Sequence, residues 1–311
     1  MAQALRQRRG PALSRRRGAL ATGRRPLPYL FVLPGLAFYL IFTVYPVLRQ
    51  FQMSFQHWQA VPGTPTPFVG LRYYAQALHD PVVHTAAINS VLYTVVTVPT
   101  QMLLGLTAAN LLHRRLPARW LWRTLIYLPV VTSWVIASYV FAYLFNTDEG
   151  LINAVLGFFA GHPVTVDWLQ NTWTSFVVIW LLAVWKGIGW SMIMFLAGLT
   201  ALDRTVVESG QVDGAHGWRL WWHVILPQIR PTAIFVFVML VIGSLQAFIS
   251  IFLLTAGGPY NSTQVLLTYT YQLAFSFFNF GYAAALASML AVVLFLLSAA
   301  EIRLLRERRP S

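Results

Sequence analysis

The sequence predicts an all-α membrane protein with six transmembrane helices, and three observations support this fold class. Apolar residues make up 57% of the chain and charged residues 10%, whereas an average soluble domain contains about 25% charged residues. The apolar residues form six blocks, each with the roughly 20 residues that a helix needs to cross about 30 Å of hydrocarbon. Arginines gather at alternate ends of these blocks, as the positive-inside rule requires.

The first element is an arginine-rich arm over residues 1–27, followed by a first span over residues 28–48. The arm contains eight arginines and no acidic residue, a composition that is also typical of targeting peptides. However, the apolar stretch after it is longer than that of a signal peptide and lacks a clear small-residue cleavage site. We therefore interpret it as a cytoplasmic arm that fixes the orientation of the chain.

Five further spans are expected within a transmembrane domain over residues 28–305, which a short cytoplasmic tail over 306–311 follows. Only the fourth span contains a charged residue, Lys186. The uncharged segment 262–280 is rich in Tyr, Thr, Gln and Ser, and we interpret it as an external connector. These five spans lie at residues 86–112, 124–145, 173–200, 233–255 and 281–300.

The distribution of arginines predicts that both termini are cytoplasmic. On the opposite side of the expected topology lie only Arg49 and Arg72. A seventh span over 262–280 would place the arginine-rich tail outside, which the positive-inside rule disfavours. The arginines on the expected cytoplasmic side are Arg6, Arg8, Arg9, Arg15, Arg16, Arg17, Arg24, Arg25, Arg114, Arg115, Arg119, Arg123, Arg204, Arg219, Arg230, Arg303, Arg306, Arg308 and Arg309.

Several kinds of chemistry find no support in the sequence. The single lysine does not belong to a G-x-x-x-x-G-K-[ST] loop, so the chain alone is not expected to hydrolyse ATP. All nine acidic residues lie in loops or at span ends, which disfavours a secondary, ion-coupled transporter with intramembrane carboxylates. No cysteine is present and no acid completes a ligand set with the histidines, so neither a metal site nor a membrane-embedded enzyme is favoured. We interpret the net charge of +13 as arginines placed at the membrane surface, and not as a binding surface for a nucleic acid.

The expected cytoplasmic loop over residues 201–232 contains its own signals for the start and end of short helices. Asp203 is expected to cap a short helix that runs through Glu208, and Gly214 and Gly217 permit a sharp turn after it. A second helix is expected to end near Leu226, because proline at position 227 lacks the N–H that continues a helix. Its tryptophans, at positions 218, 221 and 222, suit either a belt at the membrane interface or an apolar helix inserted into a partner's groove.

This loop resembles the "EAA" coupling motif of permease subunits in binding-protein-dependent ATP-binding-cassette importers, in the branch for sugars and glycerol phosphates. Ser209 and Gly210 replace the two alanines of the motif, and Asp203 stands where a proline often begins the loop helix. The resemblance extends over about residues 29–305 and includes Trp185-Lys186-Gly187 and Gly257-Gly258-Pro259. The residues at the positions of the motif are Glu208, Asp213, Gly214, Ala215, Leu226, Pro227 and Pro231.

The resemblance implies the type I permease fold of these importers and a multi-pass location in the cell inner membrane. It implies a second, homologous permease subunit, two ATPase subunits that bind ATP and magnesium, and an external solute-binding protein, with no cofactor on this chain. The solute would be a sugar or sugar-like compound, such as an oligosaccharide, glycerol 3-phosphate or a related phosphodiester. The residues implied in coupling to the ATPases are Glu208, Asp213, Gly214, Ala215, Trp218, Leu226 and Pro227.

The same resemblance places the solute pathway largely along the fourth and fifth spans. Lys186 and Trp190 are four residues apart and share one helix face, and Ser244 and Gln246 are the polar residues nearest the middle of the fifth span. An ionisable residue at this depth is a functional hypothesis. Two interpretations of Lys186 remain open: a structural residue that pairs with a backbone carbonyl or snorkels to the membrane surface, or a group that selects an anionic solute.

Overall fold

The computed structural model describes residues 27–58, 63–114 and 116–306, and these residues are almost entirely helical. Within these ranges, the single β pairing is an isolated bridge between Gln56 and Phe68. The chain divides into two compact units, over residues 1–49 and 50–311. The all-α fold class predicted from the sequence is therefore confirmed.

The described part of the first unit is one apolar helix. It runs through α1 (Leu27–Tyr39), a π-helical turn over Leu40–Val44 and the start of α2 (Tyr45–Met53). The candidate span of 23 residues, Phe31–Met53, has no buried residue. A helix that is apolar and unburied along its length is typical of a segment whose surroundings are lipid or other transmembrane helices.

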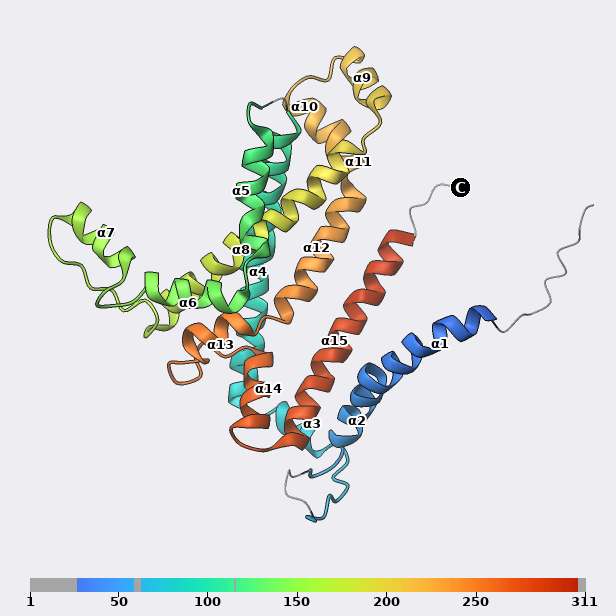
Figure 1. Cartoon of the computed structure of the whole chain (residues 1–311), viewed down its shortest axis with the longest axis vertical. Coiled ribbons are helices and arrows are strands. Elements are labelled where there is room, and N and C mark those ends of the chain that lie inside the picture. The colour runs from blue at the N-terminus through green and yellow to red at the C-terminus, as the bar shows by residue number, and fades with distance from the viewer. Residues whose placement is uncertain (1–26, 59–62, 115, 307–311) are drawn as a thin grey trace, which may run out of the picture. The chain divides into compact units, whose positions relative to one another are not determined.

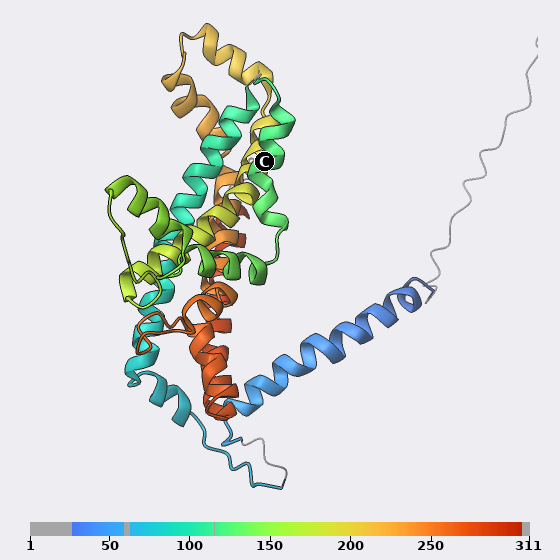
Figure 2. The same cartoon turned by 60° about the vertical axis from the view of Figure 1, so that its left-hand side comes forward.

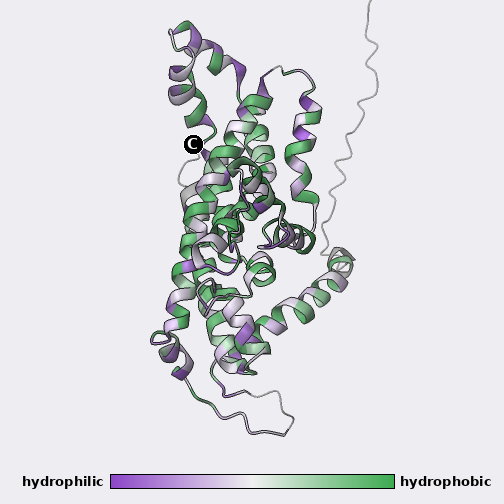
Figure 3. Cartoon of the chain, turned by 90° about the vertical axis from the view of Figure 1, so that its left-hand side faces the viewer, coloured by the Kyte–Doolittle hydropathy of each residue, from purple (hydrophilic) through white to green (hydrophobic). Residues whose placement is uncertain are grey.

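The second unit contains the other membrane-spanning helices. Figure 1 shows α9 and α10 at one end of this unit and α3 and α14 at the opposite end, and in Figure 2 the segment containing α9 and α10 projects beyond the long helices. The long helices are predominantly hydrophobic, as Figure 3 shows. The elements are α3 (Arg72–Ala77), α4 (Pro81–His113), α5 (Arg119–Val131), α6 (Trp134–Leu144), α7 (Leu151–Ala160), α8 (Thr172–Thr200), α9 (Arg204–Val212), α10 (Trp218–Leu220), a π-helical turn (Trp221–Ile225), α11 (Leu226–Gln228), α12 (Arg230–Leu245), α13 (Ile249–Thr255), α14 (Leu266–Phe275) and α15 (Phe280–Arg306).

The centre of this unit is the long contact between α4 and α8. A Cβ at Gly105 of α4 would overlap Ser191 of α8, and a Cβ at Gly189 of α8 would overlap the Ile126 carbonyl of α5. Small residues allow helix backbones to approach closely in a membrane, where packing replaces the hydrophobic effect between helices. These two glycines therefore position α8 against α4 and α5.

Two of the expected spans are broken. Within the described residues, four helices are long and apolar enough to cross a membrane, and the count reaches six if each of two bent helix pairs is one span. The third expected span bends by 96° between α5 and α6. Pro129 removes a backbone donor near the end of α5, and the Ser133 hydroxyl then accepts a hydrogen bond from the Val135 N–H to begin α6. The span expected at 124–145 therefore consists of two helices, α5 and α6, that meet at this bend.

The fifth expected span is also interrupted. α12 ends at Leu245, and α13 begins only at Ile249. At the other end of α12, the helical segment Trp218–Gln228 meets it at an angle of 68°. This segment continues two residues beyond the end expected at Leu226, because Pro227 stands near the start of the short helix α11, where its missing N–H is tolerated.

At the end of the unit that contains α3 and α14, one carboxylate joins three helices. The Asp80 side chain caps α4, because its Oδ1 accepts hydrogen bonds from the N–H groups of Val82 at 2.8 Å and Val83 at 3.4 Å. Its Oδ2 accepts from the hydroxyls of Tyr269 at 2.9 Å and Tyr282 at 2.8 Å. Burial acts to raise the pKa of Asp80, but these hydrogen bonds outweigh it and hold the pKa below the ordinary value.

We expect Asp80→Asn to lower the free energy of unfolding at pH 7 by about 1–3 kcal/mol, since hydrogen bonds to a charged acceptor are lost. A carboxylate whose pKa is depressed on folding stabilises the protein above its ordinary pKa of about 3.9, and this contribution disappears as the pH falls through the depressed value. Thermal unfolding of the detergent-solubilised protein at several pH values measures the difference, which should shrink below about pH 4. The exposed Asp167 provides the control: Asp167→Asn should match the wild type throughout, and an equal loss in both variants would contradict the role of Asp80.

Candidate functional site

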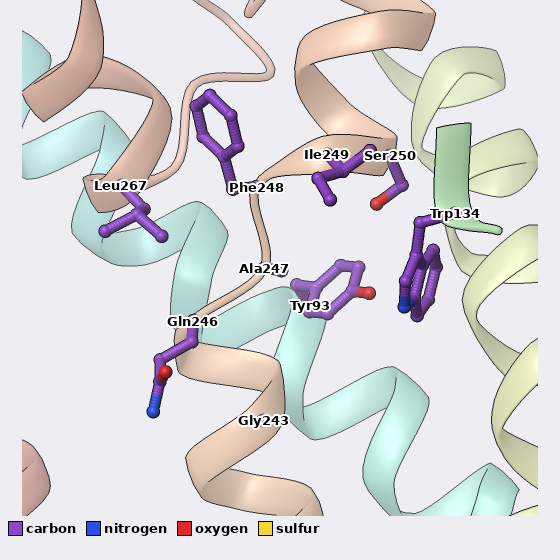
Figure 4. A pocket seen from close by; sticks show the side chains of 9 residues that line it. All are labelled: Tyr93, Trp134, Gly243, Gln246, Ala247, Phe248, Ile249, Ser250 and Leu267. Atoms are coloured by element: carbon purple, nitrogen blue, oxygen red, sulfur yellow. The ribbon is translucent and has the colours of Figure 1, made fainter.

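The two broken helices meet at a cavity. A space of about 300 Å³ lies between Tyr93 of α4, Trp134 at the start of α6 and the interruption from Gln246 to Phe248. Figure 4 shows Tyr93, Trp134 and Ser250 facing one another, whereas the Gln246 side chain points away from Trp134. Non-helical backbone at membrane depth is tolerated where it lines a cavity, so the two interruptions mark this position as the candidate solute pathway.

A second cavity of about 330 Å³ shares Tyr93 and Trp134 with the first. It is lined by three of the four predicted pathway residues, Lys186, Trp190 and Ser244, whereas Gln246 lines the first cavity. The Ser244 hydroxyl lies 2.8 Å from the Thr94 hydroxyl oxygen of α4. The structure therefore brings the predicted pathway residues to two neighbouring cavities.

Lys186 has backbone partners at the break between α5 and α6. Its side chain is 4% exposed, and its Nζ donates hydrogen bonds to the carbonyl oxygens of Pro129, at 2.9 Å, and Thr132. The ammonium also lies 5.0 Å from the ring centre of Trp134, within the range of a cation–π interaction. The last carbonyls of a helix have no partners inside it, so Lys186 acts as a cap for the broken span and fixes Trp134 beside the cavity.

Sequence reasoning missed Tyr93, Trp134 and Ser250 as cavity residues. Pro129 followed by Thr132 and Ser133 within an apolar run is a signal that could have indicated the break in the third span. The interruption after Leu245 has no proline within three residues, and its signal is weaker: Gly243 lies two residues before Leu245, and a glycine lowers helix propensity within an apolar run.

The lining of the two cavities can bind a polar solute. Aromatic rings, neutral hydroxyl and amide groups and aliphatic side chains line the two cavities, which suits a ligand that has both an apolar face and hydrogen-bonding groups. Among the described residues, no group of three His, Cys, Asp or Glu side chains could hold a metal ion. The lining residues support recognition of a solute.

The predicted coupling loop forms a helical hairpin. The Asp203 carboxylate accepts hydrogen bonds from the N–H of Thr205 at 2.9 Å and from its hydroxyl at 2.8 Å, and these bonds lower the pKa of Asp203. α9 begins directly after this cap, and the chain then turns at Gly214, with φ of +83°, and Gly217, with φ of +54°. The expected order of a capped helix, a glycine corner and a second helix is present.

The hairpin is closed by tight packing between its two helices. A Cβ at Gly210 of α9 would lie 3.0 Å from a methyl group of Val224 on the returning helix, so this position favours the smallest residue. Trp221 and Leu226 pack against the buried cluster that includes Ile229 and Phe195. This packing connects the hairpin to α8.

The outer surface of the hairpin presents most of the predicted coupling residues. Trp218 is 72% exposed and Trp222 is 48% exposed, and their rings meet edge to face. Among the predicted coupling residues, Ala215 and Leu226 are half-buried, and the exposed ones are Glu208, Asp213, Gly214, Trp218 and Pro227. An exposed aromatic pair with acidic neighbours is available to a partner protein.

Comparisons with known proteins identify relatives over nearly the whole chain. The family described as "Binding-protein-dependent transport system inner membrane component" matches residues 101–307. The chain is 32% identical to the lactose transport system permease protein LacF of Rhizobium radiobacter, over 90% of this chain and 94% of that protein. It is 30% identical to the sulfoquinovosyl glycerol transport system permease protein SmoG of Agrobacterium fabrum, over 93% of each.

The fold also matches a solved structure. A chain in the crystal structure of a bacterial ABC transporter involved in the import of the acidic polysaccharide alginate superposes with a TM-score of 0.78. The two chains are 24% identical, and the match covers 92% of this chain and 97% of that chain. This likeness confirms the predicted fold.

Proposed function

The chain belongs to the family of binding-protein-dependent transport system inner membrane components, and from this premise we propose the solute class, route and partners of its transport. The chain is a permease subunit of an ABC importer. Its solute is a sugar or sugar-like compound, because relatives at 30% identity or more are named for lactose and sulfoquinovosyl glycerol. The aromatic and neutral polar lining of the cavities is compatible with such a ligand.

The observation that carries the proposed route is the meeting of two helix breaks at Tyr93 and Trp134. Breaks expose backbone groups that a solute can reach near the middle of a span, as in other transporters with discontinuous helices. The solute would pass along α8 and α12, beside Trp190 and Gln246. Lys186 holds the bend that shapes this route and is a positioning residue in the proposal.

The proposed partners are a second, homologous permease subunit, two ATPase subunits and an external solute-binding protein. The ATPases bind ATP and magnesium and dock on the surface formed by Glu208, Asp213 and Trp218 of the hairpin. The cytoplasmic assignment of that surface is supported by the arginines near it, which include Arg119 and Arg219. Both termini then lie in the cytoplasm, and no covalent chemistry is assigned to this chain.

Reconstitution of the complete importer in proteoliposomes tests this proposal. We expect sugar uptake only when the solute-binding protein is on the face that contains Asn261 and ATP is on the face that contains Trp218. Because the chain has no cysteine, single cysteines at these two positions report the two faces by labelling. Ion-driven uptake by the chain alone would instead support a secondary transporter and reject the proposed partners.

A further inference from the structure

A cavity outside the solute pathway lies between α5 and α8, at the end of the second unit that contains the coupling hairpin. Its volume is about 600 Å³, and its lining combines Arg119 and Arg123 of α5 with apolar residues of α8, among them Ile193 and Ala197. The transport mechanism proposed above does not use this cavity. Two cationic side chains beside an apolar surface match an amphipathic anion, which has both a negative group and a hydrocarbon part.

The cationic side of the cavity comes from one helix face. Arg119 and Arg123 are four residues apart on α5, so their side chains are neighbours on the same face. Both are exposed, and in the part of the chain that the structure describes neither forms an ion pair with an acidic residue. α5 also begins without a side-chain cap, which adds the positive end of the helix dipole to the two guanidinium groups.

The apolar side comes from α8. Ile193, Ala197 and Thr200 recur at the spacing of one helix face and line the cavity below the arginines, together with the buried Leu196. This floor excludes a free inorganic anion as the best-matched ligand, because such an ion would leave the apolar surface uncovered. A hydrocarbon chain would cover it.

Two tryptophans place this cavity at the level of lipid headgroups. Trp120 is 73% exposed and Trp122 is 51% exposed. At about 100° per residue they flank the arginine pair on either side of α5. Exposed tryptophans are typical of the membrane–water interface, and basic pockets between helices at the cytoplasmic face bind anionic lipid headgroups.

We propose that this cavity binds an anionic phospholipid, with its phosphate between Arg119 and Arg123 and an acyl chain along Ile193 and Ala197 of α8. The proposed orientation of the chain assigns the lipid to the cytoplasmic leaflet. The lipid would fill the space between α5 and α8 close to the coupling hairpin. Because α5 leads into the break that Lys186 caps, the site stands beside an element of the transport route without being part of it.

The test measures binding of phosphatidylglycerol to the purified complete importer by native mass spectrometry. Two basic residues at a membrane surface predict that the double variant Arg119→Gln/Arg123→Gln binds it about 30-fold more weakly than the wild type. The matched control Arg114→Gln/Arg303→Gln removes the same charge outside the cavity and should bind like the wild type. Equal weakening in both double variants would show a general charge effect and overturn the proposal.

Three further measurements separate the lipid from other occupants. Ala197→Phe keeps both arginines but fills part of the cavity, and it should also weaken phosphatidylglycerol binding. Phosphatidylcholine should bind every variant weakly, and millimolar inorganic phosphate should not compete; effective competition by phosphate would point to a free-anion site. A disulfide or cross-link from Ala197→Cys to a partner subunit in the assembled importer would show that protein covers the cavity, and would overturn the proposal.

Discussion

Gly214→Val is expected to reduce solute uptake at least about tenfold while the chain remains inserted and folded. Gly214 has φ of +83°, and a β-branched residue in this left-handed region is a genuine outlier. Strain of this kind costs about 1–3 kcal/mol, and 1.4 kcal/mol is a factor of about ten in an equilibrium. A Cβ at this position would meet no atom within 4 Å, so the effect arises from the backbone and not from a clash within the chain.

The corner at Gly214 is held by few interactions that could resist such strain. The Gly214 N–H donates to the Gln211 carbonyl at 3.1 Å, and the Ala215 N–H donates to the Gly210 carbonyl at 2.9 Å. A changed corner would shift Trp218 and Glu208 relative to each other on the surface proposed to contact the ATPases. ATP hydrolysis would then continue without uptake, or the ATPases would dissociate.

Gly214→Asn is the matched control, since Asn adds a side chain but tolerates positive φ far better than Val. Subunit stoichiometry, ATP hydrolysis and uptake should be measured together for the wild type and both variants. We expect the Asn variant to retain most of its uptake. Normal values of all three quantities in Gly214→Val would mean that this corner does not transmit motion from the ATPases.

The hairpin shows which local features can be read from a sequence. Asp203 and the two glycines were predictable because caps and positive φ angles depend on a few adjacent residues. The exposed position of Trp218 and the inward position of Trp221 were not separable from sequence, since all three tryptophans lie within one short segment. Only the packing of Trp221 against the cluster around Ile229 distinguishes them.

The broken helices show where sequence reasoning fails. Hydropathy measures the length of an apolar run, and it does not register a bend inside the run. The residues that define the candidate site are also distant in sequence: Tyr93, Trp134 and Ser250 meet only because α4, α6 and α13 fold together. Likewise, the hydrogen bond between Asp80 and Tyr282 joins residues 202 positions apart, beyond the reach of any local pattern.

Lys186→Met is expected to destabilise the importer and to reduce uptake of every solute alike. Methionine keeps roughly the length of lysine, but it cannot donate hydrogen bonds to the carbonyls of Pro129 and Thr132. Hydrogen bonds from a charged donor contribute about 1.5–3 kcal/mol, and loss of the donor to the Thr132 carbonyl adds a desolvation penalty. The Pro129 carbonyl would keep its hydrogen bonds from the N–H and hydroxyl of Thr132. The bend between α5 and α6 would loosen, and Trp134 would lose its fixed place beside the cavity.

The two interpretations of Lys186 predict different pairs of measurements. Thermal unfolding and uptake of an anionic and a neutral sugar should be compared for the wild type, Lys186→Met and Gln101→Leu. Gln101 lines the same cavity, but the hydrogen bond that its Nε2 donates to the Ala183 carbonyl at 3.3 Å lies away from the break, so its loss should cost less stability. An unchanged unfolding temperature in Lys186→Met, with uptake of the anionic sugar lost and that of the neutral sugar kept, would make the ammonium a ligand of the solute. If Lys186 caps the broken helix, the Lys186→Met variant should unfold at a lower temperature and lose uptake of both sugars equally.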